Sequence, residues 1–311
     1  MNIKITFLTF FIFLCGTIYG QGNDNPFTRA QAIVNRGIVF FNVDGIEITA
    51  QKKDADFSTK NCVSEFPQLK IKKKELTTDS LLGFRNFYVY KSHENPANFF
   101  HITSYYFVET PDNYLIAFTF SSINKNDKEF ERKFITLACN NRIPQNIYHS
   151  NVLNTINFAG RKIPLENSNC KWLGVNNVEC SNCGQMNWSI HKDFDDASAT
   201  VNNHFISSIY RKGAEIISDA FIEVIFEGVE TTARKVVYSI TGKSSFSLNM
   251  FGGNSLALYY TPAPRNILTV YFIAAPVRGN FVSCVMSFWE SDQINSSGLP
   301  PLLEQVMELR K

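Results

Sequence analysis

The sequence predicts an α+β fold of two lobes, residues 22–148 and 155–311, each a mainly antiparallel sheet with a closing C-terminal helix. Hydrophobic residues make up 44% of the 311 residues and charged residues 19%, enough to bury the cores of about two domains. Runs rich in Phe, Tyr and Val have the length of strands and are separated by turn motifs. A helical apolar pattern ends each half, and such a helix can cover one face of a sheet.

The composition excludes several classes of protein. The chain is too apolar and too weakly charged to be disordered, and it lacks the Gly period of a fibrous protein. Lys and Arg number 30 against 28 Asp and Glu, which gives a formal charge of +2. A balance so close to neutral is not typical of a nucleic-acid-binding protein, so no nucleic-acid partner is expected.

Residues 1–20 have the pattern of a cleaved secretory signal. Lys4 precedes an apolar run from Ile5 to Cys15, and the segment ends at Gly20. The run is about ten residues long, whereas a membrane-spanning helix needs roughly 20. The junction after Gly20 resembles the export signals of Gram-negative envelope and secreted proteins.

Two other interpretations of this segment have less support. A retained membrane anchor conflicts with the short apolar run. Lipidation of Cys15 would place Leu14 where lipoprotein signals favour a small residue. Cleavage after Gly20 predicts a secreted, periplasmic or envelope-associated protein that keeps six of the seven Cys. No later segment is long and apolar enough for a second membrane span.

The first lobe begins with three short elements. Phe27–Arg36 has a helical pattern. Ile38–Ile48 has the alternation of a hairpin, with Asp44–Gly45 as its turn. The run Lys70–Lys74 allows two interpretations: a surface for an acidic partner, or a solvated edge strand whose lysines prevent further strand pairing. We favour the edge strand, because so short a run is weak evidence for a partner.

Three strands and a helix complete the first lobe. Pro111–Asn113 is the expected turn between the last two strands. Asp127 is the expected cap of a helix that carries Phe134 on its apolar face and ends near Cys139. The expected strands are Phe84–Lys91, Phe99–Glu109 and Tyr114–Ser121.

The second lobe is predicted to contain two helices and a series of strands. A helix from Ser198 to Ile217 follows Asp195 and Asp196, whose charges suit a helix start. A C-terminal helix, Pro300–Leu309, begins with prolines. The expected strands are Phe221–Glu227, Lys235–Thr241, Phe246–Met250, Ser255–Thr261, Ile267–Ala275 and Phe281–Trp289.

The strands of both lobes show a family resemblance. Phe87–Lys91 and Tyr105–Ser121 in the first lobe, and Lys235–Ile240 and Ile267–Trp289 in the second, are Phe- and Tyr-rich and stand beside a closing helix. This pattern resembles the PsbP-like domains of thylakoid-lumen and bacterial envelope proteins. The resemblance covers about half of the chain and rests on pattern, not on a motif. It implies a non-catalytic assembly or interaction role and transfers no site residues.

The Cys-rich loop 167–191 carries the most distinctive chemistry. Cys170, Cys180 and Cys183 lie within fourteen residues, and His191 follows. Three Cys and one His could bind zinc, although the spacing is not that of a known finger. Disulfide bonding is favoured because the export signal implies an oxidising compartment. A thiol-redox role for the C-x₂-C pair lacks the sequence context of thioredoxin-like sites.

Sequence alone cannot decide how the mature cysteines pair. We expect Cys62 to bond Cys139 inside the first lobe. Cys170 is expected to bond one member of the C-x₂-C pair, leaving the other member for Cys284. Each closed loop would add about 2–4 kcal/mol to stability. The disulfide candidates are therefore Cys62, Cys139, Cys170, Cys180, Cys183 and Cys284.

A candidate recognition loop follows the C-x₂-C pair. Gln185, Asn187 and Trp188 combine two amides with an indole, and such side chains often contact ligands. In the alternative interpretation Trp188 fills the core and the amides satisfy backbone groups. We favour this alternative.

The usual catalytic motifs are missing from the sequence. It contains no G-x-S-x-G, H-E-x-x-H, Walker or G-x-G-x-x-G pattern. We therefore expect an exported, non-enzymatic binding or assembly protein without a cofactor, whose partner is a protein or an envelope component. A secreted hydrolase with a site around His191, Asp195 and Glu290 is one alternative. A structural zinc-binding protein is the other.

Overall fold

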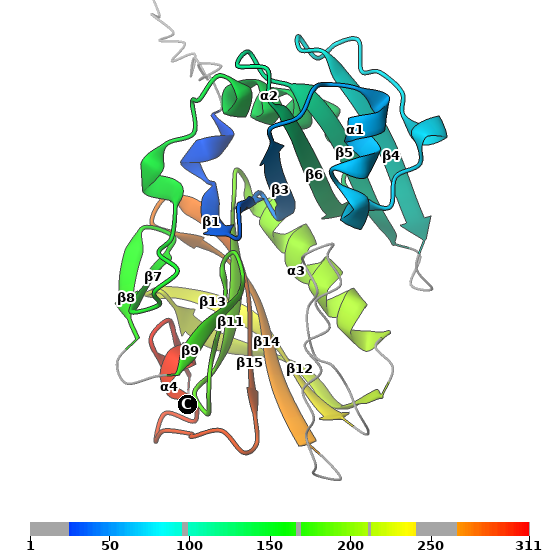
Figure 1. Ribbon diagram of the computed structural model, residues 1–311. Helices are drawn as coiled ribbons and strands as arrows, with labels where there is room; N and C mark the ends of the chain where they lie inside the picture. The colour runs from blue at the N-terminus through cyan, green and yellow to red at the C-terminus, as the bar shows by residue number, and fades with distance from the viewer. Residues whose placement is uncertain (1–24, 95–98, 166–168, 211–212, 241–265, 311) are drawn as a thin grey trace, which may run out of the picture.

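The computed structural model describes residues 25–94, 99–165, 169–210, 213–240 and 266–310 (Figure 1). The predicted signal 1–20, with Cys15, lies outside these residues, and so do the expected strands Phe246–Met250 and Ser255–Thr261. Strands dominate the described part of the chain, where they form two large antiparallel sheets and one small sheet.

The first large sheet, sheet A, has six strands in the order β1-β2-β3-β6-β5-β4. Every neighbouring pair is antiparallel. The predicted hairpin turn is confirmed: Asp44 and Gly45 have φ of 51° and 73°, the tight turn geometry that Asp-Gly favours. The strands are β1 (Gln31–Asn35), β2 (Ile38–Val43), β3 (Ile46–Lys53), β4 (Asn86–Glu94), β5 (Phe100–Glu109) and β6 (Leu115–Ile123).

Helices and loops cover both faces of sheet A. Helix α2 (Lys128–Cys139) lies behind the sheet in Figure 1 and packs Phe134 into the core on that face. Asp127 caps this helix as predicted, by accepting a backbone hydrogen bond from its first turn. Helix α1 (Thr59–Ser64) and the loop after it, with Phe66, cover the opposite face. The 3₁₀ helices of this part are η1 (Pro26–Thr28), η2 (Pro67–Leu69), η3 (Lys73–Glu75) and η4 (Gln145–Ile147).

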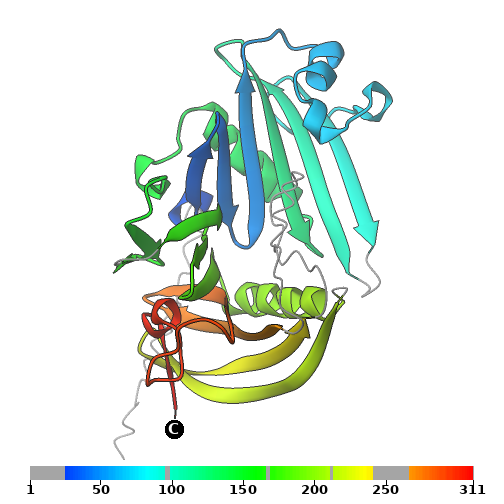
Figure 2. The ribbon, with the colours of Figure 1, turned by 60° about the horizontal axis from the view of Figure 1, so that its bottom comes forward.

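The second large sheet, sheet C, has eight strands in the described residues, in the order β16-β12-β13-β14-β15-β11-β10-β9. It curves beneath helix α3 (Phe194–Ile209), which lies between the two large sheets (Figure 2). Phe205 of α3 packs on Val236 and Phe272 of the sheet. The strands are β9 (Cys170–Gly174), β10 (Asn177–Cys180), β11 (Gly184–His191), β12 (Ala214–Phe226), β13 (Val229–Ile240), β14 (Asn266–Val277), β15 (Asn280–Trp289) and β16 (Met307–Leu309).

The other face of sheet C carries its own core. Trp188 packs there against Phe158 of the small sheet, with ring centroids 5.4 Å apart. Leu302 and Leu303 from the last helix complete the cover. The covering elements are β7 (Thr155–Phe158), β8 (Arg161–Pro164) and α4 (Pro301–Glu304).

The predicted α+β class with closing helices is wrong, because the described chain is mainly antiparallel β. Helix α2 closes sheet A, but α3, which precedes β12 in the chain, covers sheet C. The expected helix Pro300–Leu309 ends at Glu304, and Met307–Leu309 pairs with β12 instead. So short a segment is marginal as a helix. The edge of β12 satisfies its backbone groups and places Met307 in the core.

Two local predictions in the first lobe are also wrong. Phe27–Arg36 is a 3₁₀ turn followed by β1, because Gln31–Asn35 pairs with β2. The run Lys70–Lys74 is not an edge strand and lies in a loop that includes η3. The strand predictions in the described residues outside this run are confirmed, with shifted ends.

The predicted helix Ser198–Ile217 has both ends misplaced. It begins earlier, because the Asp193 side chain caps it by accepting a hydrogen bond from the backbone of Asp196 at 2.8 Å. It ends at Ile209, and Ile216 and its neighbour belong to β12. The true strand is therefore longer than the predicted one.

Candidate functional site

The residues of the predicted recognition loop lie on a central strand. Gln185, Asn187 and Trp188 belong to β11, which pairs with β15 on one side and β10 on the other. The indole N–H of buried Trp188 donates to Oε1 of Gln31 at 2.9 Å, and the Gln31 amide donates to the carbonyl of Asn157 at 2.8 Å. Trp188 therefore joins the two large sheets, and the strand leaves no loop for ligand contacts.

The turn between β2 and β3 inserts beside these residues and forms an inter-sheet junction with Arg29, Lys192 and Thr200. Asp44 accepts hydrogen bonds from Arg29 Nε and Nη2 at 2.8 and 3.0 Å, and from the backbone N–H of Lys192 at 3.0 Å. A Cβ on Gly45 would lie 2.8 Å from Oγ1 of Thr200 in α3. With its positive φ as well, this position requires glycine.

His191, a member of the alternative hydrolase site, is buried next to this junction. Its Nε2 lies 2.8 Å from Oγ of Ser283. Burial lowers the pKa of His191 to about 4, although the carboxylate of Asp44 opposes this shift, so the ring is neutral at pH 7. A serine beside a neutral histidine is a nucleophile–base pair in principle. Both residues are buried here, so a substrate cannot reach them in this conformation.

The structure does not bring together the three hydrolase candidates. Asp195 is exposed in the first turn of α3. Glu290 is exposed just beyond β15, at the end opposite Phe281, which pairs with His191. The length of β15 separates Glu290 from His191 by about 30 Å at roughly 3.3 Å per strand residue. These groups cannot act on one substrate.

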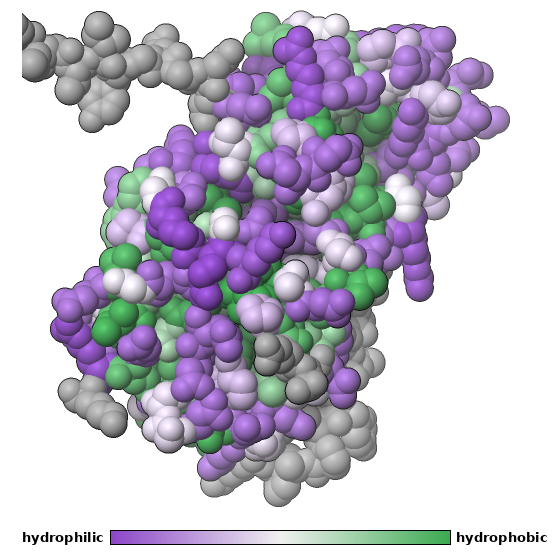
Figure 3. All heavy atoms as spheres, turned by 90° about the vertical axis from the view of Figure 1, so that its left-hand side faces the viewer, coloured by the Kyte–Doolittle hydropathy of each residue, from purple (hydrophilic) through white to green (hydrophobic). Residues whose placement is uncertain are grey.

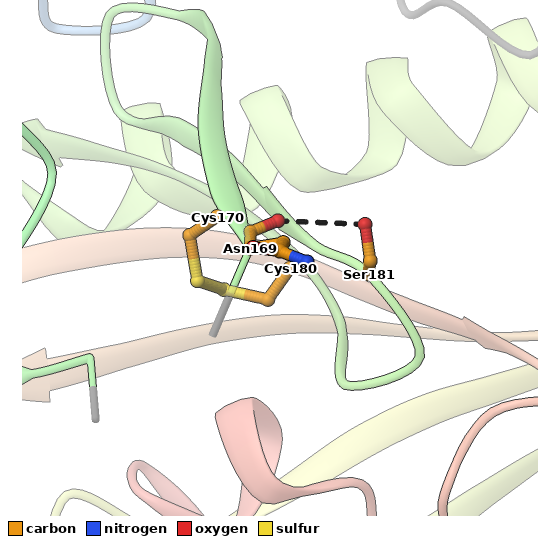
Figure 4. Close-up of a disulfide and its surroundings, with 4 residues drawn as sticks. All are labelled: Asn169, Cys170, Cys180 and Ser181. Atoms are coloured by element: carbon orange, nitrogen blue, oxygen red, sulfur yellow. Dashed lines mark hydrogen bonds between the residues drawn. A yellow bond between two sulfur atoms is a disulfide. The ribbon is translucent and has the colours of Figure 1, made fainter. Parts of the chain in front are cut away.

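A disulfide joins Cys170 of β9 to Cys180 of β10 (Figure 4). The two cysteines are directly opposite in the antiparallel ladder, so the strand pairing itself brings their side chains together. Beside the bond, the Ser181 hydroxyl donates to the carbonyl of Asn169 at 3.4 Å. Cys180 is one of the two partners expected for Cys170, and the bond is compatible with an oxidising compartment.

The alternative zinc set is not assembled. It needs Cys170 and Cys180 as separate thiolates, and the disulfide uses both sulfurs. Cys183 precedes β11, whereas His191 is its last residue, about 25 Å away along the strand. The described residues contain no other group of three or more ligands that could hold a metal.

The other expected disulfides do not form. Cys62, Cys139, Cys183 and Cys284 are free thiols. Cys62 packs in the core under α1 and Cys139 in the core under α2, so sheet A separates them. Burial raises the pKa of each of these two thiols to about 12, which keeps them protonated and unreactive. Cys284 lies in the core of sheet C and is paired with Trp188, away from Cys183, which precedes β11.

A cavity of about 250 Å³ lies between the β12–β13 turn and α4. Its principal charged group, the buried carboxylate of Glu227, forms ion pairs with Arg161 and Arg278. Arg161 also donates to the carbonyl of Gln305 at 2.7 Å. These groups satisfy one another, and the volume is below the roughly 300–1,000 Å³ of typical ligand pockets. The cavity is a small gap where the β12–β13 turn and the segment after α4 pack together, and we do not interpret it as a ligand site.

The face of the molecule that carries β7 and β8 is mostly hydrophilic (Figure 3). Apolar side chains appear there as small groups separated by polar ones. A partner-binding surface generally presents a larger continuous apolar area. This face therefore offers no obvious docking surface.

The clearest candidate site in the described residues is an unpaired strand edge, the outer side of β12 at the rim of the lower sheet in Figure 2. One side of this strand pairs with β13 along its length, whereas the other pairs with β16 only at Val224–Phe226. Residues Ala214–Glu223, here named the β12 edge, have no second strand partner among the described residues. Exposed apolar side chains lie there: Ile216 (44%), Ile217 (55%) and Phe221 (69%).

The sequence interpretation missed the β12 edge because it assigned Ile216 and Ile217 to a helix. Two adjacent β-branched residues favour a strand, and this signal could have found it. Glu215, Asp219 and Glu223 supply the charges that edge strands commonly carry against uncontrolled pairing.

Comparisons with protein-family models, curated proteins and solved structures found no match to this chain. Among the residues that the structure describes, none of the helices has the length and apolar character needed to cross a membrane. The function is therefore inferred from the geometry of the chain itself.

Proposed function

We propose that this protein is exported and acts by binding, and that an extended segment of a partner protein pairs with the β12 edge. The observation that carries the proposal is an open strand edge with three exposed apolar side chains. An open edge offers backbone N–H and C=O groups to an incoming strand. In this mode of recognition the main chain supplies affinity and alternate side chains supply specificity.

The charges along the β12 edge favour a basic partner. Asp219 is paired with Arg234 at 2.6 Å. Glu215 and Glu223 are exposed and form no ion pair within the described residues. A partner strand with basic side chains opposite these two carboxylates and apolar side chains near Phe221 would complement the edge. Phe221 and Glu223 are two positions apart in the strand and lie on the same face of the sheet. The proposed partner is therefore an extended segment that carries both basic and apolar residues on the same face.

The arrangement of the polar groups supports binding over catalysis. The pair of His191 and Ser283 is buried, and Asp195 and Glu290 lie apart from it. A catalytic site needs its acid, base and nucleophile around one accessible point. A non-catalytic interaction role is also what the resemblance to PsbP-like domains implies, and the signal pattern supports export.

A defined peptide tests the proposal. The probe is a short labelled peptide of Val-Val-Lys-Lys repeats, which presents both valine and lysine on each face of a strand, with binding measured by fluorescence anisotropy. We expect Ile217→Lys and Phe221→Lys each to weaken binding by about tenfold or more, because each removes an apolar contact and adds a like charge. Replacing the peptide's lysines with glutamates should have a similar effect.

Leu81→Lys is the matched control, because Leu81 is 73% exposed and lies outside the β12 edge. It should leave binding unchanged. Equal weakening by Leu81→Lys, or no weakening by the two edge variants, would refute docking at this edge. Turnover of a hydrolysable substrate by the purified wild-type chain would instead support the hydrolase alternative.

A further inference from the structure

A cluster of ionisable side chains is buried beneath α2, on the face of sheet A that this helix covers. Asp79 comes from the loop before β4, Tyr106 from β5 and Glu131 from α2, and each is more than nine-tenths buried. The Tyr106 hydroxyl lies 3.2 Å from Oδ2 of Asp79 and 3.0 Å from Oε2 of Glu131. Three elements that are distant in the chain therefore meet at one hydroxyl group.

Asp79 is the ionised member of the cluster. Arg132 Nε donates to its Oδ2 at 2.8 Å, and the backbone N–H of Leu81 donates to its Oδ1 at 3.1 Å. Burial opposes ionisation, but these hydrogen bonds and the charge of Arg132 outweigh it and lower the pKa of Asp79. Asn86 fastens the same loop, exchanging two hydrogen bonds of 3.0 Å with the backbone of Asp79.

Glu131 is in the opposite situation. Burial raises the pKa of Glu131 to about 7, although hydrogen bonds from Ser104 and Tyr106 and the charge of Lys128 oppose this shift. Asp127 adds to it. The titratable and charged groups around the cluster are Asp79 of the loop, Tyr88 of β4, Tyr106 of β5, and Asp127, Lys128 and Arg132 of α2.

The single hydrogen of the tyrosine hydroxyl cannot serve two carboxylates at once. When Glu131 is ionised, Tyr106 donates either to Glu131 or to Asp79, while Arg132 still donates to Asp79. Two buried carboxylates of like charge then face each other across one hydroxyl group. When Glu131 is protonated, its hydroxyl donates to the Tyr106 oxygen, and Tyr106 donates to Asp79. The protonated state therefore lets Tyr106 bond both carboxyl groups at once and removes the repulsion between them.

We propose that Glu131, Tyr106 and Asp79 form a proton-operated clamp, in which a proton on Glu131 holds α2 and the Asp79 loop against sheet A and its loss loosens them. Helix α2 supplies Phe134 and Ile135 to the core on this face, so repulsion at the clamp acts on the packing of the whole helix. The clamp makes the fold respond to the pH around the protein, independently of what binds the β12 edge.

The comparison of Glu131→Gln with wild type tests the clamp. Glutamine keeps the size and the donor of the protonated acid but cannot ionise. In the folded state Glu131 binds its proton more tightly than in the unfolded state, so its contribution is full below pH 4.5 and is lost as the pH rises to about 7. Between pH 5 and 8, the unfolding constant of wild type relative to Glu131→Gln should rise roughly 70-fold. Chemical denaturation at each pH measures it.

Glu129→Gln is the matched control, because Glu129 is exposed on the same helix. It should follow the wild-type pH profile. Parallel profiles for wild type and Glu131→Gln would overturn the proposal. A measurement on the wild-type chain covers the case in which the variant fails to fold: carbon NMR of the Glu131 carboxyl should titrate near pH 7, and a midpoint near 4.5 would equally overturn it.

Discussion

The cluster beneath α2 and the β12 edge depart in opposite directions from the usual partition of polar and apolar side chains. Beneath α2, Glu131 and Asp79 are ionisable and buried, whereas at the β12 edge Ile217 and Phe221 are apolar and exposed. The buried groups find partners inside the chain. The exposed strand edge finds none among the described residues. The buried carboxyl groups are therefore satisfied within the fold, whereas the backbone groups of the β12 edge have no strand partner among the described residues.

The inter-sheet junction provides the largest expected effect, because it buries an ion pair. Asp44→Asn keeps the turn, since Asn tolerates the positive φ at this position. It leaves the charge of Arg29 without the carboxylate that now accepts two of its hydrogen bonds. We expect the free energy of unfolding to fall by about 3–5 kcal/mol, measured by urea denaturation.

Asp195→Asn is the control, because this carboxylate is exposed in the first turn of α3. It should change stability by about 0.5 kcal/mol or less. Equal effects of Asp44→Asn and Asp195→Asn would break the distinction between buried and exposed polar groups.

His191 should make the free energy of unfolding depend on pH in the direction opposite to that expected for the clamp. Its folded-state pKa of about 4 lies below the unfolded value of 6.5. The unfolded chain therefore takes up a proton first, and stability that is full above pH 6.5 is lost as the pH falls to 4. The loss should reach about 3 kcal/mol and should be absent from His191→Gln.

Denaturation of both chains between pH 7.5 and 4 measures this difference, with the exposed His93→Gln as control. If His191→Gln loses as much stability in acid as wild type does, the loss comes from other groups in the molecule and the prediction is wrong.

The smallest expected effect on stability tests the β12 edge against its own strand. Phe221→Ala removes an exposed ring and should change the free energy of unfolding by about 0.5 kcal/mol or less. Phe226→Ala, five positions along β12, removes a fully buried ring and should cost about 3–5 kcal/mol. Thermal unfolding of both variants gives the contrast. A large loss of stability in Phe221→Ala would show that this ring packs in the folded core, and it would then not belong to the proposed docking edge.

Local chemistry predicted two elements from their turn or cap residues. Asp44 and Gly45 formed the expected hairpin turn, and Asp127 capped the expected helix. The bond between Cys170 and Cys180 was one of two expected pairings, because close cysteines have few partners to choose from.

The remaining site residues could not be found from the sequence. Cys62 and Cys139 proved to lie on opposite faces of sheet A, which no local pattern reveals. Asp79, Tyr106 and Glu131 come from a loop, a strand and a helix that meet only after folding.

The sequence by itself determined the Asp44–Gly45 turn, the Asp127 cap and several of the strand-forming runs, because these depend on backbone preferences of a few neighbouring residues. Only the tertiary structure decided that Met307–Leu309 forms a strand, that Ile216 and Ile217 leave the helix, and that Trp188 joins two sheets. Short apolar segments are compatible with both helix and strand. The choice falls to the partner that satisfies their backbone hydrogen bonds, and that partner comes from a distant part of the chain.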